Sequence, residues 1–209
     1  AMTMSATSRP AQMRAEYSGV PLRAIAQLAK SWNFSEASFG MAALNSYYAT
    51  PSVADEHGFA LADAPWPQIF DPFRNAVAGK KVAVIGHFPF APKALNQAAD
   101  FYMLERSLNE GDYPDSAAEY ILPECDYVFI TGSAFVNKTA PRLLELSRES
   151  FNVVLGPSTP LAPVLLEDYG VSQVTGMVPT SPLAMFEGLS GTDAGTTMFD
   201  WGHRVELSA

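Results

Sequence analysis

The sequence is poor in cysteine, and this scarcity excludes several kinds of site. Cys125 is the single cysteine among 209 residues, so neither an internal disulfide nor a zinc site built from several cysteines can form. No apolar run approaches the roughly 20 residues that cross a bilayer. No basic segment with an apolar core and a small-residue cleavage site opens the chain, so secretion is not indicated. We therefore expect a cytoplasmic protein without a membrane partner.

Basic residues are also scarce. Lys and Arg number 13 against 22 Asp and Glu, which gives a formal net charge of −9 at pH 7. Binding to nucleic-acid phosphates needs clustered Lys and Arg, and no cluster is present, so we expect no nucleic-acid partner. The Gly-x-Ser-x-Gly elbow, the Walker loop and the His-Glu-x-x-His pair are missing too, so no common catalytic signature identifies an enzyme.

The N-terminal part predicts a small α+β unit. Residues 1–8 alternate apolar and polar side chains, which is typical of a half-buried strand. Such a strand needs a partner, so we expect that residues before Ala1 are missing. One helix is predicted to begin at Pro21. A second begins after Asn33, whose side chain can cap it while Glu36 returns a bond to the cap backbone.

Residues 50–79 are rich in Pro, Asp and Ala, and we interpret them as a linker with one short helix. A domain boundary is expected within this stretch. We place it near residue 75, so that residues 1–75 form the small α+β domain with its linker and residues 76–209 form a larger α/β domain.

Beyond Lys80 the chain alternates short apolar runs with helical stretches, which favours an α/β fold with a mostly parallel sheet and helices on both faces. The predicted strands are 82–86, 101–105, 127–131, 152–156 and 173–177, with a last strand at 204–207. Helices are predicted around 93–99, 115–122, 139–149, 161–168 and 182–188. Glycines within 188–198 permit, without requiring, a lid there.

Glycine stands at the ends of four of the five predicted parallel strands, and small hydroxyl residues accompany three of these ends. In open α/β sheets, ligands bind beyond the carboxyl ends of the strands. Each turn alone is explained by good turn and cap formers. As a set converging on one edge, they predict a binding crevice. The candidate ligand-binding residues are Gly86, Phe88, Gly132, Ser133, Asn137, Thr139, Gly156, Pro157, Ser158 and Thr159, and the fifth strand would contribute the turn Thr175-Gly176-Met177.

His87 and Glu105 are the candidate catalytic residues of this crevice. His87 is the only histidine at a predicted strand end and could act as an acid/base group or a metal ligand, or it could be a turn histidine bonded to backbone. Glu105 is the last residue of the predicted second strand, where a ribose-binding carboxylate belongs in dinucleotide folds. The phosphate loop of those folds is absent, because Gly86 is followed by His-Phe-Pro-Phe. Ordinary NAD binding is thereby disfavoured, whereas a mononucleotide or methyl-donor site stays open.

Several motifs together resemble the family called the putative heavy-metal chelation domain. They are Val84-Ile85-Gly86-His87-Phe88-Pro89-Phe90, Glu105-Arg106, Ile130-Thr131-Gly132-Ser133-Ala134, Asn137-Lys138-Thr139 and Gly156-Pro157-Ser158-Thr159-Pro160-Leu161. Upstream, Ser31-Trp32-Asn33, Glu36-Ala37, Gly40 and Ala42-Ala43-Leu44-Asn45 resemble the domain that usually precedes it. The resemblance implies an enolase-N-terminal-like α+β domain, a Rossmann-like domain and a candidate active site between them.

The leading hypothesis is a cleft between the two domains that binds a small polar ligand, a metal ion or a metal chelate. A divalent ion is the cofactor that the resemblance suggests, held by His87 and Glu105 with help from Glu36, a ligand set suited to zinc or nickel. Glu36 and Asn45 would be the first domain's contribution. The alternatives are a metal-independent transferase or lyase on a nucleotide-like or amino-acid-derived substrate, and a non-catalytic carrier of metal or cofactor. A homodimer is the default assembly for such a chain.

Overall fold

The computed structural model describes residues 4, 9–11, 16–190 and 198–209. The strand predicted over residues 1–8 lies outside this part of the chain apart from Met4, as does most of the segment 188–198. Within the described ranges, no helix is both long and apolar enough to cross a membrane.

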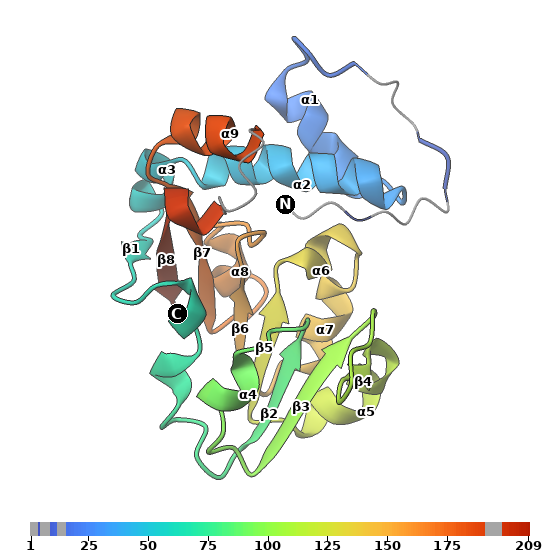
Figure 1. The fold of residues 1–209 in the computed structure, drawn as a ribbon. Coiled ribbons are helices and arrows are strands. Elements are labelled where there is room, and N and C mark those ends of the chain that lie inside the picture. Colours follow the sequence, from blue (N-terminus) through green and yellow to red (C-terminus); the bar gives the residue numbers. More distant parts are fainter. Residues whose placement is uncertain (1–3, 5–8, 12–15, 191–197) are drawn as a thin grey trace.

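A single mixed sheet organises the molecule, in the order β1-β8-β7-β6-β5-β2-β3-β4 (Figure 1). The strands of the described residues are β1 (Ala60–Leu61), β2 (Lys81–Ile85), β3 (Asp100–Glu105), β4 (Tyr113–Pro114), β5 (Tyr127–Thr131), β6 (Phe151–Leu155), β7 (Gln173–Pro179) and β8 (Gly202–Ser208). The pairs from β4 across to β7 are all parallel, whereas β8 is antiparallel to both β7 and β1. The predicted mostly parallel sheet is confirmed.

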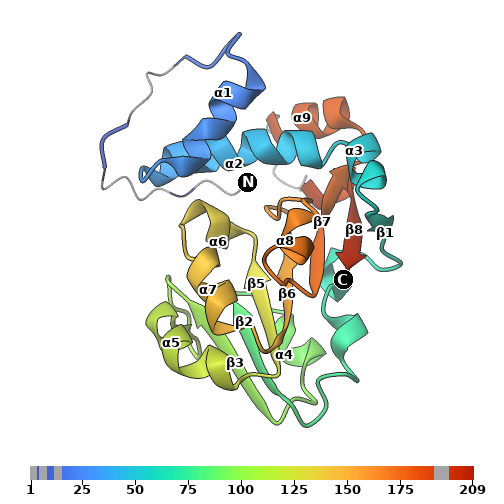
Figure 2. The same cartoon turned by 180° about the vertical axis from the view of Figure 1, so that it is seen from behind.

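Apolar side chains of the central strands face both ways. Ala83 and Ile85 of β2 join one buried cluster, while Val82 and Val84 join another on the opposite face. Figure 2 shows helices α5 to α8 on one face, and α4 lies on the other (Figure 1). A strand buried on both faces requires a run of apolar residues without alternation, which is the pattern that β2 has in the sequence.

The helices are short except for the second and the last. Their bounds are α1 (Leu22–Ala26), α2 (Phe34–Tyr48), α3 (Pro51–Glu56), α4 (Ala91–Ala94), α5 (Ala118–Ile121), α6 (Ser133–Val136), α7 (Ala140–Leu146), α8 (Val164–Glu167) and α9 (Pro182–Ser190). Short 3₁₀ turns extend several of them, including Gln27–Lys30 after α1 and Leu122–Glu124 after α5. The predicted helical stretches are therefore present, although they are split into shorter pieces.

The interpretation of residues 50–79 as a linker needs correction. This stretch contains α3, β1 and two 3₁₀ turns, Trp66–Gln68 and Asp71–Phe73. Its aromatic and apolar side chains pack with α4 over one face of the sheet, where Phe70 and Val77 are fully buried. A free linker does not bury large side chains in this way, so the stretch is part of the folded core. Its proline content alone did not indicate this burial. The domain boundary near residue 75 stays a prediction.

The fifth parallel strand also differs from its predicted bounds. β7 continues to Pro179 because its second half pairs with β8, from Gly176 opposite Val205 to Pro179 opposite Gly202. Thr175 and Gly176 are consequently inside the strand and not at its end. The turn predicted at Thr175-Gly176-Met177 is therefore wrong, and β7 contributes no residue to the lining of the strand-end cavity described below.

Helix α2 lies across the edge of the sheet toward which β2 and β3 point (Figure 1). Asn33 caps it as predicted, since its Oδ1 accepts from the backbone N of Ser35 at 3.1 Å and of Glu36 at 3.3 Å. The return bond to the cap differs: Ser31 Oγ accepts from the Asn33 N at 3.0 Å and itself donates to Glu36 Oε2 at 2.6 Å.

Gly40 allows α2 to approach the preceding 3₁₀ turn closely. A Cβ atom added at Gly40 would lie 1.8 Å from the backbone N of Ala29. We predict that Gly40→Ala lowers the free energy of unfolding by about 2 kcal/mol or more, despite alanine's higher helix propensity. Ser46→Ala, a helix-favouring exchange on the exposed side of α2, is the control. Equal stability of both variants in urea denaturation would contradict the close contact.

Candidate functional site

A cavity of about 710 Å³ lies at the carboxyl ends of the parallel strands. The turns after β2, β3, β5 and β6 line it, and Met4 and Phe34 add apolar surface from the N-terminal part. Ten of the predicted site residues line it: Gly86, His87, Phe88, Glu105, Ser133, Asn137, Thr139, Gly156, Pro157 and Ser158. The structure thus brings His87, Asn137 and Ser158 together from three separate crossovers.

Two glycines shape this cavity through their backbone conformation. Gly86 has φ +104° and Gly156 has φ +117°, a region that residues with a side chain rarely adopt. A Cβ atom on Gly86 would also lie 3.2 Å from both Phe88 and Thr131. The sharp turns after β2 and β6 therefore depend on glycine, as their positions in the sequence suggested.

Four predicted residues support the cavity without lining it. Gly132 packs so closely on the next turn that a Cβ atom there would lie 2.4 Å from the backbone N of Thr159. Thr159 itself is buried, and so are Glu36 and Asn45 of α2. Asn45 Nδ2 donates to the carbonyl oxygen of Ser158 at 2.8 Å, which joins α2 to the turn after β6. None of these four residues lines the cavity, and their contact with a ligand stays a prediction.

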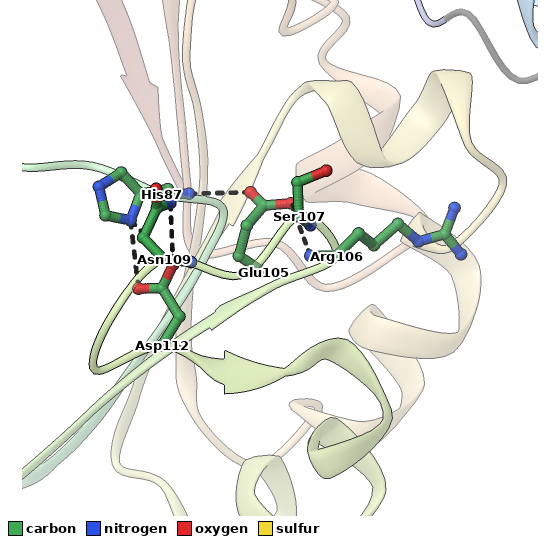
Figure 3. A network of polar contacts seen from close by, with 6 residues as sticks. All are labelled: His87, Glu105, Arg106, Ser107, Asn109 and Asp112. Carbon is green, nitrogen blue, oxygen red and sulfur yellow. Dashed lines mark hydrogen bonds and ion pairs between the residues drawn. The ribbon is translucent and has the colours of Figure 1, made fainter.

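His87 forms the most distinctive polar contact of the site. Its Nδ1 lies 3.0 Å from Oδ2 of Asp112, a side chain with no exposed surface (Figure 3). The backbone N and the Nδ2 of Asn109 also donate to Asp112 Oδ2, at 3.0 and 3.2 Å. Although burial acts in the opposite direction, the hydrogen bonds from Asn109 and His87 hold the pKa of Asp112 below its ordinary value. The carboxylate therefore fixes the orientation of the imidazole ring.

Glu105 is occupied by backbone donors. Its Oε2 accepts from the backbone N of His87 at 3.0 Å, and its Oε1 accepts from the backbone N of Arg106 at 2.6 Å and of Ser107 at 3.3 Å (Figure 3). These bonds join the turn after β2 to the turn after β3. Glu105 therefore positions His87, and the same bonds compete with a role as metal ligand or ribose acceptor.

Asn137 and Thr139 form a second local unit. Asn137 Oδ1 accepts from the Thr139 backbone N at 3.1 Å and from its Oγ1 at 2.6 Å, which leaves the amide group of Asn137 as the donor available to a ligand. Lys138 between them has φ +68°, and its Nζ donates to the carbonyl oxygen of Ala29. Burial lowers the pKa of Lys138. This turn is therefore attached to the N-terminal helices.

The sequence interpretation missed part of the lining. The missed polar residues are Arg106, Ser107, Thr131 and Asp115, and the missed apolar residues are Ile85, Leu104, Ala134, Leu143, Phe34 and Met4. Arg106 and Asp115 form an ion pair of 2.8 Å, both side chains being about half exposed. Arg106 directly follows Glu105 and could have been found from that position. Asp115 could not, since only the path of the chain between residues 106 and 115 brings it back to the cavity. Asp112 does not line the cavity and acts on it through its contact with His87.

Comparison with protein families identifies the family of this chain. A family model described as putative heavy-metal chelation, DUF364, matches residues 68–205, and a second model with the same description, DUF4213, matches residues 1–48. The first match spans more than half of the chain. This chain belongs to the DUF364 family. The resemblance seen in the strand-end motifs is thus confirmed at the level of the family.

Solved structures of DUF364 proteins have the same fold. A DUF364 protein of unknown function from Desulfitobacterium hafniense is 45% identical, with a TM-score of 0.80 over 90% of this chain and 74% of that chain. One from Pyrococcus horikoshii is 22% identical, with a TM-score of 0.76 over 97% and 80% of the two chains. An uncharacterised protein of Methanocaldococcus jannaschii is 29% identical over 101 residues, which span 46% of this chain but only 39% of that protein.

The described residues of this DUF364 protein do not fit a resident metal ion. No group of three His, Cys, Asp or Glu side chains among them could hold one. His87 and Glu105 lack a third ligand there, and both oxygens of Glu105 accept backbone hydrogen bonds. Cys125 precedes β5, at the opposite end of the strand from the cavity, and burial raises its pKa to about 12. A soft metal would therefore find no thiolate in the cavity.

The Asn45 bond to Ser158 predicts a measurable contribution to stability. We expect Asn45→Ala to lower the free energy of unfolding by about 1–3 kcal/mol, because a buried carbonyl oxygen loses a donor. Asn75→Ala, which removes the same group from an exposed position, should change it by less than about 0.5 kcal/mol. Chemical denaturation measures both values, and indistinguishable results would contradict the role of Asn45.

Proposed function

We propose that the cavity at the strand ends binds a small polar organic ligand, and that a heavy metal reaches it as a chelate held by that ligand. The observation that carries the proposal is the convergence of polar groups from four turns on one cavity of about 710 Å³. Cavities of several hundred Å³ with a few convergent polar groups are typical of small-molecule sites.

The lining suggests the chemistry of the ligand. Arg106, Asn137 and the backbone of the glycine turns offer donors, while Asp115 and the serine hydroxyls offer acceptors. Ile85, Phe88 and Leu104 add apolar surface. A ligand with both acidic and amino or hydroxyl groups on a short carbon skeleton matches this mixture. Many metal-chelating metabolites have this composition, which agrees with the description of the DUF364 family.

We further propose that the molecule consists of a Rossmann-like domain and an enolase-N-terminal-like domain, with the cavity between them. The parallel strands β4-β3-β2-β5-β6-β7 follow the spatial order 3-2-1-4-5-6 of doubly wound dinucleotide folds, which supports the first part. The cavity lies beside β2 and β5, where this order reverses. Met4 and Phe34 in the lining support a contribution of the N-terminal part.

Titration calorimetry with free and chelated metal tests the proposal. We expect Zn²⁺ or Ni²⁺ complexed by citrate or histidine to bind the wild-type chain, and Asn137→Ala and His87→Ala to weaken binding roughly tenfold through the loss of one hydrogen bond each. His57→Ala, a histidine outside this cavity, is the matched control. Chelates that bind all four proteins equally, or that do not bind at micromolar concentration, would refute the proposal.

A second candidate function is acid–base catalysis at the same cavity, as a lyase or transferase. The contact between His87 Nδ1 and Asp112 favours it, because a buried carboxylate that orients an imidazole leaves the other ring nitrogen for proton transfer. In that case Glu105 would be a positioning residue, since it binds the backbone of His87.

Turnover of a metabolite mixture separates this enzyme from a carrier, which should leave the mixture unchanged. If a reaction is found, we expect Asp112→Asn to lower kcat about a hundredfold or more with little change in KM, because the imidazole loses its fixed tautomer. Asp168→Asn at an exposed position is the control. A proportional rise in KM instead would assign Asp112 to ligand binding and contradict its role in proton transfer.

A further inference from the structure

A second cavity, of about 310 Å³, lies between the start of β8 and the segment that follows β1. Its lining residues are Ala62, Asp63, Ala64, Pro65, Trp66, Pro67, Phe199, Gly202, His203 and Arg204. None of them lines the cavity at the strand ends. This second cavity is therefore a separate feature, and neither proposed function uses it.

Arg204 is a buried cation whose hydrogen-bonding groups are not satisfied. Its side chain is 3% exposed, and its Nε and Nη1 have no hydrogen-bond partner among the described residues. The nearest carboxylate in an ion pair, Glu206, is 3.9 Å from Nη2, which is too long for a hydrogen bond. Burial lowers the pKa of Arg204, although Glu206 and Asp63 act in the opposite direction. A guanidinium nevertheless stays charged, so an anionic partner is expected.

The backbone of Arg204 is fixed on both sides. It lies opposite Met177 in the antiparallel β7–β8 pair, and its carbonyl oxygen accepts from the backbone N of Ala62 at 3.0 Å. These pairings hold the backbone of Arg204 beside the second cavity. Arg204 lines the adjacent cavity while its Nε and Nη1 are covered, so a ligand there would bind them only after a rotation of the side chain.

The remaining walls suit the organic part of an anion. Trp66 is 7% exposed, its Nε1 has no partner among the described residues, and its ring centroid lies 5.6 Å from that of Phe199. Pro65 and Pro67 flank the indole. The carboxylate of Asp63 also lines the cavity, which disfavours a multiply charged ligand. A single negative charge on a flat apolar group matches this surface best.

We propose that the second cavity binds a small organic carboxylate, with the carboxylate group on Arg204 and the apolar group against Trp66 and Phe199. The guanidinium and the indole N–H supply donors that have no other partner in the described protein. Binding turns the guanidinium toward the ligand. The site is independent of the strand-end cavity and of its function.

Benzoate is a suitable probe, titrated into the full chain by calorimetry at constant ionic strength. We expect saturable binding that Arg204→Met weakens about ten- to a hundredfold, through the loss of a charge-assisted hydrogen bond. Arg148→Met, which removes a side chain that is 76% exposed, should bind like wild type. Tighter binding of inorganic phosphate than of benzoate would overturn the choice of a carboxylate, and equal binding by Arg204→Met would overturn the site.

The indole N–H resonance of Trp66 provides a test that does not depend on an Arg204 variant being folded. In the Trp32→Phe/Trp201→Phe double variant it is the only tryptophan signal, because the chain has three tryptophans. We expect this signal to shift saturably with benzoate, with the midpoint found by calorimetry, and not with chloride at equal ionic strength. A resonance that benzoate leaves unmoved would overturn the proposal.

Discussion

The parallel pairing of β2 with β5 is the constraint on which the site depends. The register aligns Val82 with Tyr127 and Ile85 with Ile130, so both strands end at the same level of the sheet. Backbone hydrogen bonding continues one residue further between β2 and β3, where Gly86 N donates to the Leu104 carbonyl oxygen at 2.8 Å. It does the same between β5 and β6, where Gly132 N donates to the Leu155 carbonyl oxygen at 2.8 Å. The polar turns after four strands therefore open on one edge, and the cavity forms there.

The carboxylates of Glu105 and Asp112 at this edge stabilise the loops themselves. Glu105 accepts three backbone N–H groups and Asp112 accepts from Asn109 and His87. Carboxylates engaged in this way hold the turns in place at the cost of their availability to a metal ion. This explains how a member of the DUF364 family can have an acidic cavity edge and yet no three-ligand cluster among the described residues.

The contacts of α2 show why some predicted residues lie behind the cavity. Asn45 and Glu36 are polar residues of a helix, and their sequence positions suggested ligand contacts. In the structure α2 is buried along much of its length against α6 and the turn after β6, so both side chains are enclosed and bonded to the protein. Which side of a helix is covered depends on its neighbours, and those neighbours are over 80 residues away in sequence.

The sequence by itself determined the alternation of strands and helices, the sheet's buried centre and the glycine turns after β2 and β6, because these follow from local apolar runs and backbone conformation. It also identified His87, Asn137 and Ser158, since residues after parallel strands share one edge. Only the tertiary structure decided that residues 66–77 cover a face of the sheet and that β7 extends to Pro179. It also decided that Asp112 contacts His87 and that Arg204 lines the second cavity. These features come from long-range pairing and loop paths, which leave no local pattern in the chain.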